Sequence, residues 1–218
     1  MRPNLILASL AIALLCSTDL IAQPETKKIE VGPLFTSITK PDFFGGRTEA
    51  GFGGRFTFNL TEYLAAEAEG DFFPGNCVTC TGENVGNLTE GFFGLKAGKR
   101  FKRFGLFAKG RPGFASFSQG KFDLVLLPTP PGIYPQFLIN RSRQTNFAFD
   151  LGGVIELYHS KRIFTRFDGG DTMIRYGSRT NTFFSFDPET GITTPFRFTT
   201  PAHTRHNFQF SASVGFRF

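Results

Sequence analysis

The last thirteen residues, HNFQFSASVGFRF (His206–Phe218), alternate apolar and polar side chains without a break. Apolar side chains fill one set of alternate positions: Phe208, Phe210, Ala212, Val214, Phe216 and Phe218. Small or polar residues fill the other set: Asn207, Gln209, Ser211, Ser213, Gly215 and Arg217. Because neighbouring side chains on a β-strand point to opposite faces, this pattern predicts a strand with one apolar face and one polar face. Its length also suits a strand that crosses a membrane.

The same alternation recurs in seven earlier segments: 28–38, 47–59, 63–73, 88–100, 104–116, 146–158 and 162–176. Two of them are irregular. Pro33 weakens the first, since proline has no N–H for the ladder. In the last, strict alternation would put Asp171 on the apolar face. We therefore predict a β-bulge at Gly169-Gly170 that returns Asp171 and Arg175 to the polar face.

The connections between these segments alternate in length. Short turns fall near residues 60–62, 101–103 and 159–161, whereas the connections 39–46, 74–87, 117–145 and 177–205 are longer. Membrane barrels have short periplasmic turns and longer extracellular loops. The sequence therefore predicts an all-β protein, an eight-stranded antiparallel up-and-down transmembrane β-barrel with both termini on the short-turn side.

The first 22 residues are expected to be a cleavable signal peptide. Arg2 provides a positive start, and the apolar run from Leu5 to Leu15 is too short to span a bilayer as a helix. Cleavage after Ala22 would leave residues 23–218 as the barrel domain. The formal net charge is +6, but the charges are scattered singly except at 99–103. We therefore expect no nucleic-acid partner, and the sequence contains no motif that calls for a cofactor or a metal.

Charged residues gather on the polar faces of the predicted strands. The lumen of an eight-stranded barrel is only wide enough to be filled by side chains, so charges inside it have to pair with one another. The residues expected to form this lumen network are Glu49, Arg55, Glu67, Glu69, Asp71, Glu90, Lys96, Lys109, Arg111, Asp150, Glu156, Arg166, Asp168 and Arg217. Such a lumen is a plug and not a channel. The alternative is a soluble periplasmic sandwich or lipocalin-like carrier, in which the polar faces would meet water.

The eight segments, the loop asymmetry and the terminal Val214–Phe218 together resemble the OmpA-like small outer-membrane β-barrel family over residues 28–218. The resemblance implies location in the outer membrane of a diderm bacterium and contact with outer-membrane lipid. It also implies that Phe216 and Phe218 form the C-terminal signal read by the barrel assembly machinery. Ser213 departs from that signal, which usually has glycine there. We expect a monomer.

Two cysteines remain after the leader, Cys77 and Cys80, in a Gly-rich segment. In an exported protein we expect them to form a disulfide that staples this loop. A redox-active pair would be expected at the start of a helix, and no four-ligand zinc set accompanies the cysteines.

The function expected is that of a structural or surface-interaction barrel without catalysis. The long connection 117–145 is apolar for an exposed loop, so it could bind a partner, fold over the barrel mouth or extend the strands as a hairpin. The alternative is a barrel enzyme that acts on lipid or peptide at the extracellular rim. His203 and His206 with Asp187 would then supply a general base, although no matching nucleophile is visible.

Overall fold

The computed structural model describes residues 27–40, 46–75, 85–127, 136–187 and 189–218, and these contain ten β-strands. The strands are β1 (Ile29–Lys40), β2 (Arg47–Asn59), β3 (Leu64–Phe73), β4 (Leu88–Arg100), β5 (Phe104–Leu126), β6 (Phe137–Tyr158), β7 (Ile163–Tyr176), β8 (Arg179–Phe186), β9 (Thr193–Thr200) and β10 (His203–Arg217). No helix in this part of the chain is long and apolar enough to cross a membrane.

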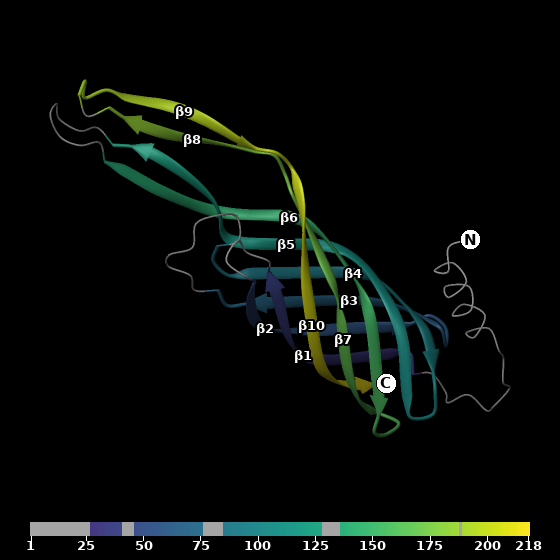
Figure 1. Ribbon diagram of the computed structural model, residues 1–218. Coiled ribbons are helices and arrows are strands. Elements are labelled where there is room, and N and C mark those ends of the chain that lie inside the picture. The colour runs from purple at the N-terminus through teal and green to yellow at the C-terminus, as the bar shows by residue number, and fades with distance from the viewer. Residues whose placement is uncertain (1–26, 41–45, 76–84, 128–135, 188) are drawn as a thin grey trace, which may run out of the picture.

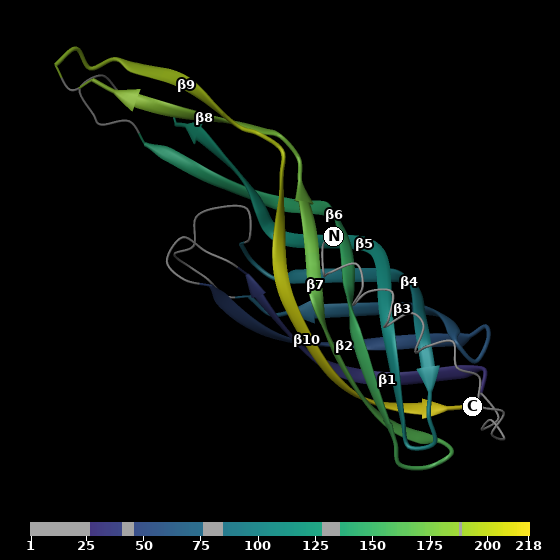
Figure 2. The ribbon, with the colours of Figure 1, turned by 45° about the vertical axis from the view of Figure 1, so that its right-hand side comes forward.

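Eight of the strands close into an antiparallel barrel in the order β1-β10-β7-β6-β5-β4-β3-β2 (Figures 1 and 2). Each barrel strand pairs with the barrel strands that precede and follow it in the chain, and β10 closes the ring against β1. The Phe218 amide donates to the Ile29 carbonyl at 2.9 Å, so both ends of the barrel lie on the short-turn side. The predicted eight-stranded up-and-down barrel is confirmed.

Two of the predicted long connections are themselves β-structure. β5 and β6 continue past the other strands, out to a pairing of Leu126 with Phe137, with a register shift between Phe117 and Lys121. Of the three possibilities for residues 117–145, the hairpin extension is therefore the one observed for the described residues. The connection 177–205, predicted as a loop, contains the separate hairpin β8–β9.

The two faces of the barrel wall differ as the alternation predicts. Outward-facing apolar rings are well exposed, for example Phe35 (60%), Phe52 (60%) and Phe93 (66%), while inward-facing charged residues such as Glu67 and Lys96 are fully buried. A soluble barrel would reverse this arrangement, because its apolar residues would fill the core. An apolar exterior around a closed set of backbone hydrogen bonds suits a bilayer.

The predicted bulge at Gly169-Gly170 is wrong. β7 keeps one register against both neighbours, with Gly170 opposite Gly152 and Gly169 opposite Gly153. A Cβ on Gly152 would lie 2.4 Å from the Gly169 carbonyl oxygen, so these glycines allow close strand approach and mark no bulge. Asp171 and Arg175 consequently stay on the outward face. Pro33 does not stop β1, although no pairing with β10 occurs at Gly32 and Pro33.

Candidate functional site

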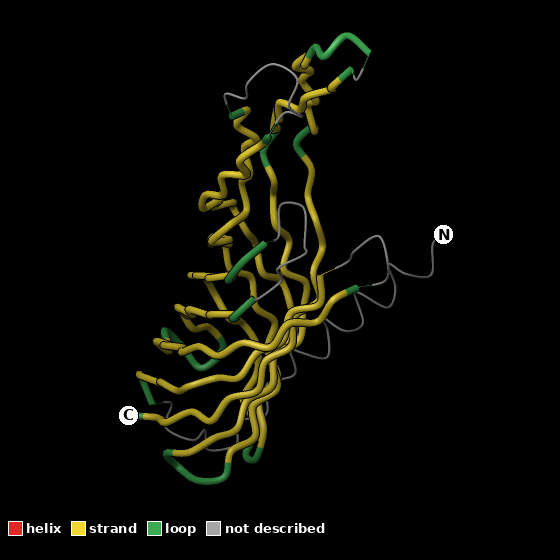
Figure 3. Tube along the Cα trace, turned by 90° about the vertical axis from the view of Figure 1, so that its left-hand side faces the viewer, coloured by secondary structure: helices red, strands yellow, loops and turns green. Residues whose placement is uncertain are grey.

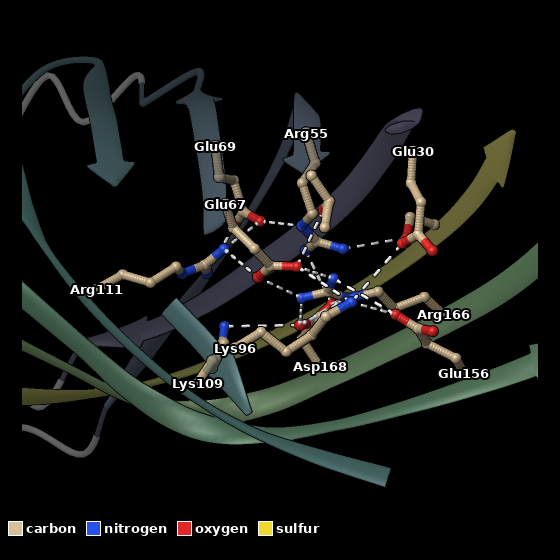
Figure 4. Close-up of polar contacts among 12 residues, drawn as sticks. Glu30, Arg55, Glu67, Glu69, Lys96, Lys109, Arg111, Glu156, Arg166 and Asp168 are labelled. Carbon is tan, nitrogen blue, oxygen red and sulfur yellow. Dashed lines mark hydrogen bonds and ion pairs between the residues drawn. The ribbon is translucent and has the colours of Figure 1, made fainter. Parts of the chain in front are cut away.

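The centre of the lumen is built around Arg166 of β7. Its guanidinium donates to both carboxylate oxygens of Glu67 on β3, at 3.0 Å for Nη2–Oε2, and to Asp168 on its own strand at 2.7 Å. Strands β3 and β7 lie four places apart in a ring of eight, that is, on opposite walls. Figure 4 shows the two side chains meeting in the middle of the barrel. The pair therefore ties the two walls together.

A second tie runs through Glu69 on β3. Arg111 of β5 makes a forked contact with the two Glu69 oxygens at 2.8 and 3.0 Å, and it also donates to Asp150 on β6. Arg55 of β2 binds the same Glu69 and reaches Asp168 at 2.8 Å. Forked guanidinium–carboxylate pairs are strong and fix orientation as well as distance. These residues link five strands into one network.

Nearer the short-turn end, Lys96 and Arg217 form a further layer. Lys96 Nζ lies 2.5 Å from Glu156 and 3.4 Å from Glu67, which joins this layer to the central one. Arg217 binds Glu156 at 3.0 Å and stacks on the rings of Tyr158 and Phe164. Lys109 adds a contact to Asp150 at 2.9 Å.

The structure places the side chains of all fourteen predicted network residues inside the barrel. Sequence reasoning missed three more charged residues there: Glu30, Lys40 and Arg100. Glu30 binds Arg217 at 3.0 Å, and Lys40 binds Glu49 at 2.6 Å. Alternation within 28–38 and 88–100 already put Glu30 and Arg100 on the polar faces, whereas Lys40 lies beyond the predicted end of its strand.

Asp71 and Glu90 are the exception within the network. They are direct cross-strand partners on β3 and β4, and both are almost completely buried. Within the described part of the chain, none of their four carboxylate oxygens has a hydrogen-bond partner, and neither side chain forms a salt bridge. Two buried carboxylates placed opposite one another are costly. Asp71 and Glu90 are therefore buried carboxylates without a cation partner among the described residues of the network.

Above these carboxylates an apolar cap closes the lumen on the long-loop side. Its members are Ile38, Phe73, Leu88, Phe92, Ala115, Phe117, Ala148, Ile174 and Tyr176. Phe117 and Tyr176 stack with their ring centroids 6.3 Å apart, and Lys40 Nζ lies over the Phe117 ring. A cavity lined by Arg55, Arg166 and Phe164 has a volume of only about 10 Å³, enough for a single water molecule. The lumen is thus closed by ion pairs below and by apolar side chains above.

The extended strands and the β8–β9 hairpin form a projection that we call the arm (residues 118–127, 136–143, 177–187 and 189–202). Figure 3 shows it reaching away from the barrel on the side opposite the short turns. Ring contacts join its two hairpins: Phe122 meets Phe183, and Phe137 meets Phe184. Large apolar side chains nevertheless stay exposed on it: Val125 (46%), Leu138 (55%), Ile139 (56%), Phe196 (52%) and Phe198 (59%).

Arg179 fastens the hairpins to one another. Its guanidinium donates to the carbonyl oxygens of Gly120 and Phe122 at 2.9 and 3.0 Å and lies over the Phe122 ring. Gly120 lies within the register shift of β5, between Phe117 and Lys121, and Phe122 follows it, paired again with Arg141. Arg179 therefore joins β8 to β5 at the irregularity in the β5–β6 ladder.

The residues predicted for catalysis do not come together. Asp187 caps the β8–β9 turn, accepting from the Thr190 hydroxyl at 2.7 Å and from the Glu189 amide at 2.9 Å. These two hydrogen bonds hold the pKa of Asp187 below its ordinary value. His206 binds Asp171 at 2.6 Å on the outer wall, and His203 contacts the Pro201 carbonyl and stacks on Tyr176. The contacts of Asp187 are therefore those of a turn residue.

The predicted disulfide and the predicted C-terminal assembly signal are the two sites that remain. Cys77 and Cys80 fall outside the described residues. Phe216 and Phe218 do lie within them, at the end of β10, and both rings are exposed (43% and 67%).

The sequence matches no protein-family model and no curated protein. Among solved structures, the chain is similar to Neisserial surface protein A, at 11% identity over 87% of this chain and 97% of that one, with a TM-score of 0.51. The chain has the fold of a small outer-membrane β-barrel. The chain is also similar to Ail of Yersinia pestis, at 7% identity over 89% of this chain and 100% of that one, with a lower TM-score of 0.45. The N-terminal barrel of Pseudomonas aeruginosa OprF is also similar (14% identity, 88% and 98% coverage, TM-score 0.40).

The predicted resemblance to OmpA-like small outer-membrane barrels is confirmed at the level of the fold. The predicted location in the outer membrane of a diderm bacterium agrees with this fold and with the apolar outer wall.

Proposed function

We propose that this protein is a non-catalytic outer-membrane anchor whose arm contacts a partner outside the cell. The observation that carries the proposal is the contrast between the two parts of the molecule. The lumen is filled with paired charges and capped by apolar side chains, so it offers no route for a solute. The arm, in contrast, leaves large apolar side chains uncovered, which monomeric soluble surfaces seldom do.

The chemistry of the arm favours a partner with an apolar surface. Phe196 and Phe198 lie on one face of β9, and Phe196 stacks on Phe183, which in turn contacts β5. Aromatic rings held by neighbouring rings present a large contact area at little entropic cost, and such residues commonly dominate binding energy. Phe196 and Phe198 are thus the residues we expect to contribute most.

Selection from a displayed random-peptide library tests this function. The protein would be extracted from outer membranes, placed in nanodiscs and compared with the variant Phe196→Ser/Phe198→Ser. Leu60→Ser is the matched control, because Leu60 is equally exposed (51%) but lies in the short turn after β2. We expect peptides enriched by the unmodified protein and by Leu60→Ser to be lost with the double variant. Equal enrichment by all three proteins, or none above empty nanodiscs, would overturn the proposal.

We also propose how the protein is recognised for assembly, what its oligomeric state is and how its two remaining cysteines are paired. Phe216 and Phe218 are the residues we expect the barrel assembly machinery to recognise, and their exposed rings at the end of β10 support this role. The protein is expected to be a monomer. Cys77 and Cys80 are expected to be oxidised to a disulfide, which mass measurement after alkylation with and without prior reduction would test.

A further inference from the structure

Asp71 and Glu90 stand opposite one another on β3 and β4, immediately below the apolar cap. The next inward-facing pair of the same ladder, Phe73 and Leu88, belongs to that cap and is completely buried. Asp71 and Glu90 are only 3% and 1% exposed, yet none of their four carboxyl oxygens has a hydrogen-bond partner among the described residues. On the β2 side, a Cβ added to Gly53 would lie 2.2 Å from the Asp71 Oδ1, so this carboxyl group is packed against the strand backbone. The pair is therefore enclosed and unsatisfied.

Among the described residues, the charged groups that face this pair are already engaged elsewhere. They come from four strands, with one neutral amide from a fifth: Lys40 of β1, Glu69 of β3, Arg111 of β5, Asp150 of β6 and Gln209 of β10. Lys40 is held by Glu49 at 2.6 Å, and Arg111 binds both Glu69 and Asp150. The two nearby cations thus serve other acids, and two of the facing groups are acids themselves.

The lumen as a whole has one acid more than it has cations. Counted over the described residues, nine acidic side chains are buried inside it: Glu30, Glu49, Glu67, Glu69, Asp71, Glu90, Asp150, Glu156 and Asp168. Eight cations accompany them: Lys40, Arg55, Lys96, Arg100, Lys109, Arg111, Arg166 and Arg217. Arg47 is not among them, because its side chain is 45% exposed at the start of β2. A charge buried without a counter-charge is costly, so the lumen needs one further positive charge.

We infer that Asp71 and Glu90 together bind one proton at neutral pH, which equalises the charges of the lumen beneath the closed cap. When two carboxyl groups share a site, their like charges oppose one another and one group keeps its proton. A proton needs no cavity, and in the described residues no set of three or more acidic, histidine or cysteine side chains converges to hold a metal ion. The unfolded chain releases the proton above about pH 5, where free carboxyl groups are ionised. The folded barrel should therefore lose stability as the pH rises.

Infrared spectroscopy of the protein in lipid vesicles tests this inference, because a protonated carboxyl group has a carbonyl band that a carboxylate lacks. We expect this band in the unmodified protein at neutral pH. Asp71→Asn and Glu90→Gln each leave eight acids against eight cations, so either change alone should abolish the band. Asp123→Asn is the matched control, since Asp123 is exposed in the arm and its loss should leave the band unchanged. A heat-dependent change in electrophoretic mobility would show that each variant is folded.

Urea unfolding between about pH 6 and about pH 9 gives a second, independent measurement. While the folded barrel alone holds the proton, its folding equilibrium constant should fall roughly tenfold per pH unit relative to that of either single variant. No carboxyl band in the unmodified protein, or a band that both variants retain, would overturn the inference, and so would an equal pH dependence of the three proteins. A missing band together with one metal ion per chain after dialysis would assign the site to a metal cation and not to a proton.

Discussion

Arg166 and Glu67 face one another across the lumen, and the Arg166 Nη2 lies 3.0 Å from the Glu67 Oε2. They stand on strands four places apart in the ring, so the contact forms only after the barrel has closed. Arg166 also binds Asp168, and Glu67 also receives Lys96, so each member of the pair has a second partner. The Arg166–Glu67 contact therefore links two processes: the charges pair only when the barrel closes, and their pairing stabilises the closed barrel.

Replacing Arg166 with methionine should destabilise the barrel strongly. The change leaves Glu67 and Asp168 buried with fewer cations, and breaking one side of a buried ion pair costs about 3–5 kcal/mol. Urea unfolding of the protein in lipid vesicles measures the effect. The double variant Arg166→Met/Glu67→Gln should recover part of the loss, because it removes the orphaned charge as well. A single variant as stable as the unmodified protein would contradict the role assigned to this pair.

Neutralising Asp71 or Glu90 should have the opposite effect. Neither carboxylate has a hydrogen-bond or ion-pair partner among the described residues, so Asp71→Asn or Glu90→Gln removes a buried charge without breaking a contact. We expect a stabilisation of about 1–3 kcal/mol in the same unfolding measurement. Glu67→Gln is the matched control and should destabilise. Loss of stability in both Asp71→Asn and Glu90→Gln would show that these carboxylates are paired after all.

The barrel should insulate a membrane even when its apolar cap is damaged. Phe117→Ala removes a completely buried ring from the cap, at a cost of about 3–5 kcal/mol in stability. The ion-pair network below the cap remains, so we expect no steady current through planar bilayers for either the unmodified protein or the variant. A steady current through the variant but not through the unmodified protein would show that the apolar cap, and not the ion-pair network, closes the lumen.

Arg179→Ala should loosen the arm without changing the barrel. The variant loses two hydrogen bonds to the carbonyl oxygens of Gly120 and Phe122. At this partly exposed site the two bonds together contribute about 1.5 kcal/mol, so the arm should open roughly tenfold more often. Limited proteolysis of vesicle-embedded protein would show faster cleavage in the arm, with an unchanged heat-dependent mobility shift for the barrel. Arg179→Lys keeps the charge but not the planar fork, so its cleavage rate should be intermediate.

The β8–β9 turn should depend on pH only in acid. Hydrogen bonds lower the pKa of Asp187 in the folded protein, so their contribution is complete above the ordinary pKa of about 3.9 and is lost as the pH falls through the lower folded value. NMR shifts of the Glu189 and Thr190 amides would follow this change, which Asp187→Asn should abolish. A transition near neutral pH would instead point to a titrating partner for Asp187.

The sequence by itself determined the strands of this barrel and which face of each strand is apolar. Alternation is a local property, since neighbouring side chains on any strand point in opposite directions. This is why the terminal segment 206–218 predicts its own two faces correctly, and why residues such as Glu67 and Lys96 could be assigned to the lumen before their partners were known.

The tertiary structure alone decided which charges pair, because pairing depends on the register between strands and on closure of the ring. Glu67 meets Arg166, 99 residues away in the chain, and Asp71 meets no cation, although both acids lie on the same face of β3. The predicted bulge would place Asp171 inside, but the glycines of β6 and β7 pair closely in one register and leave it outside, where it lies 2.6 Å from His206. The arm likewise depends on contacts such as Arg179 with Phe122 that join strands distant in the sequence, and no local pattern encodes these.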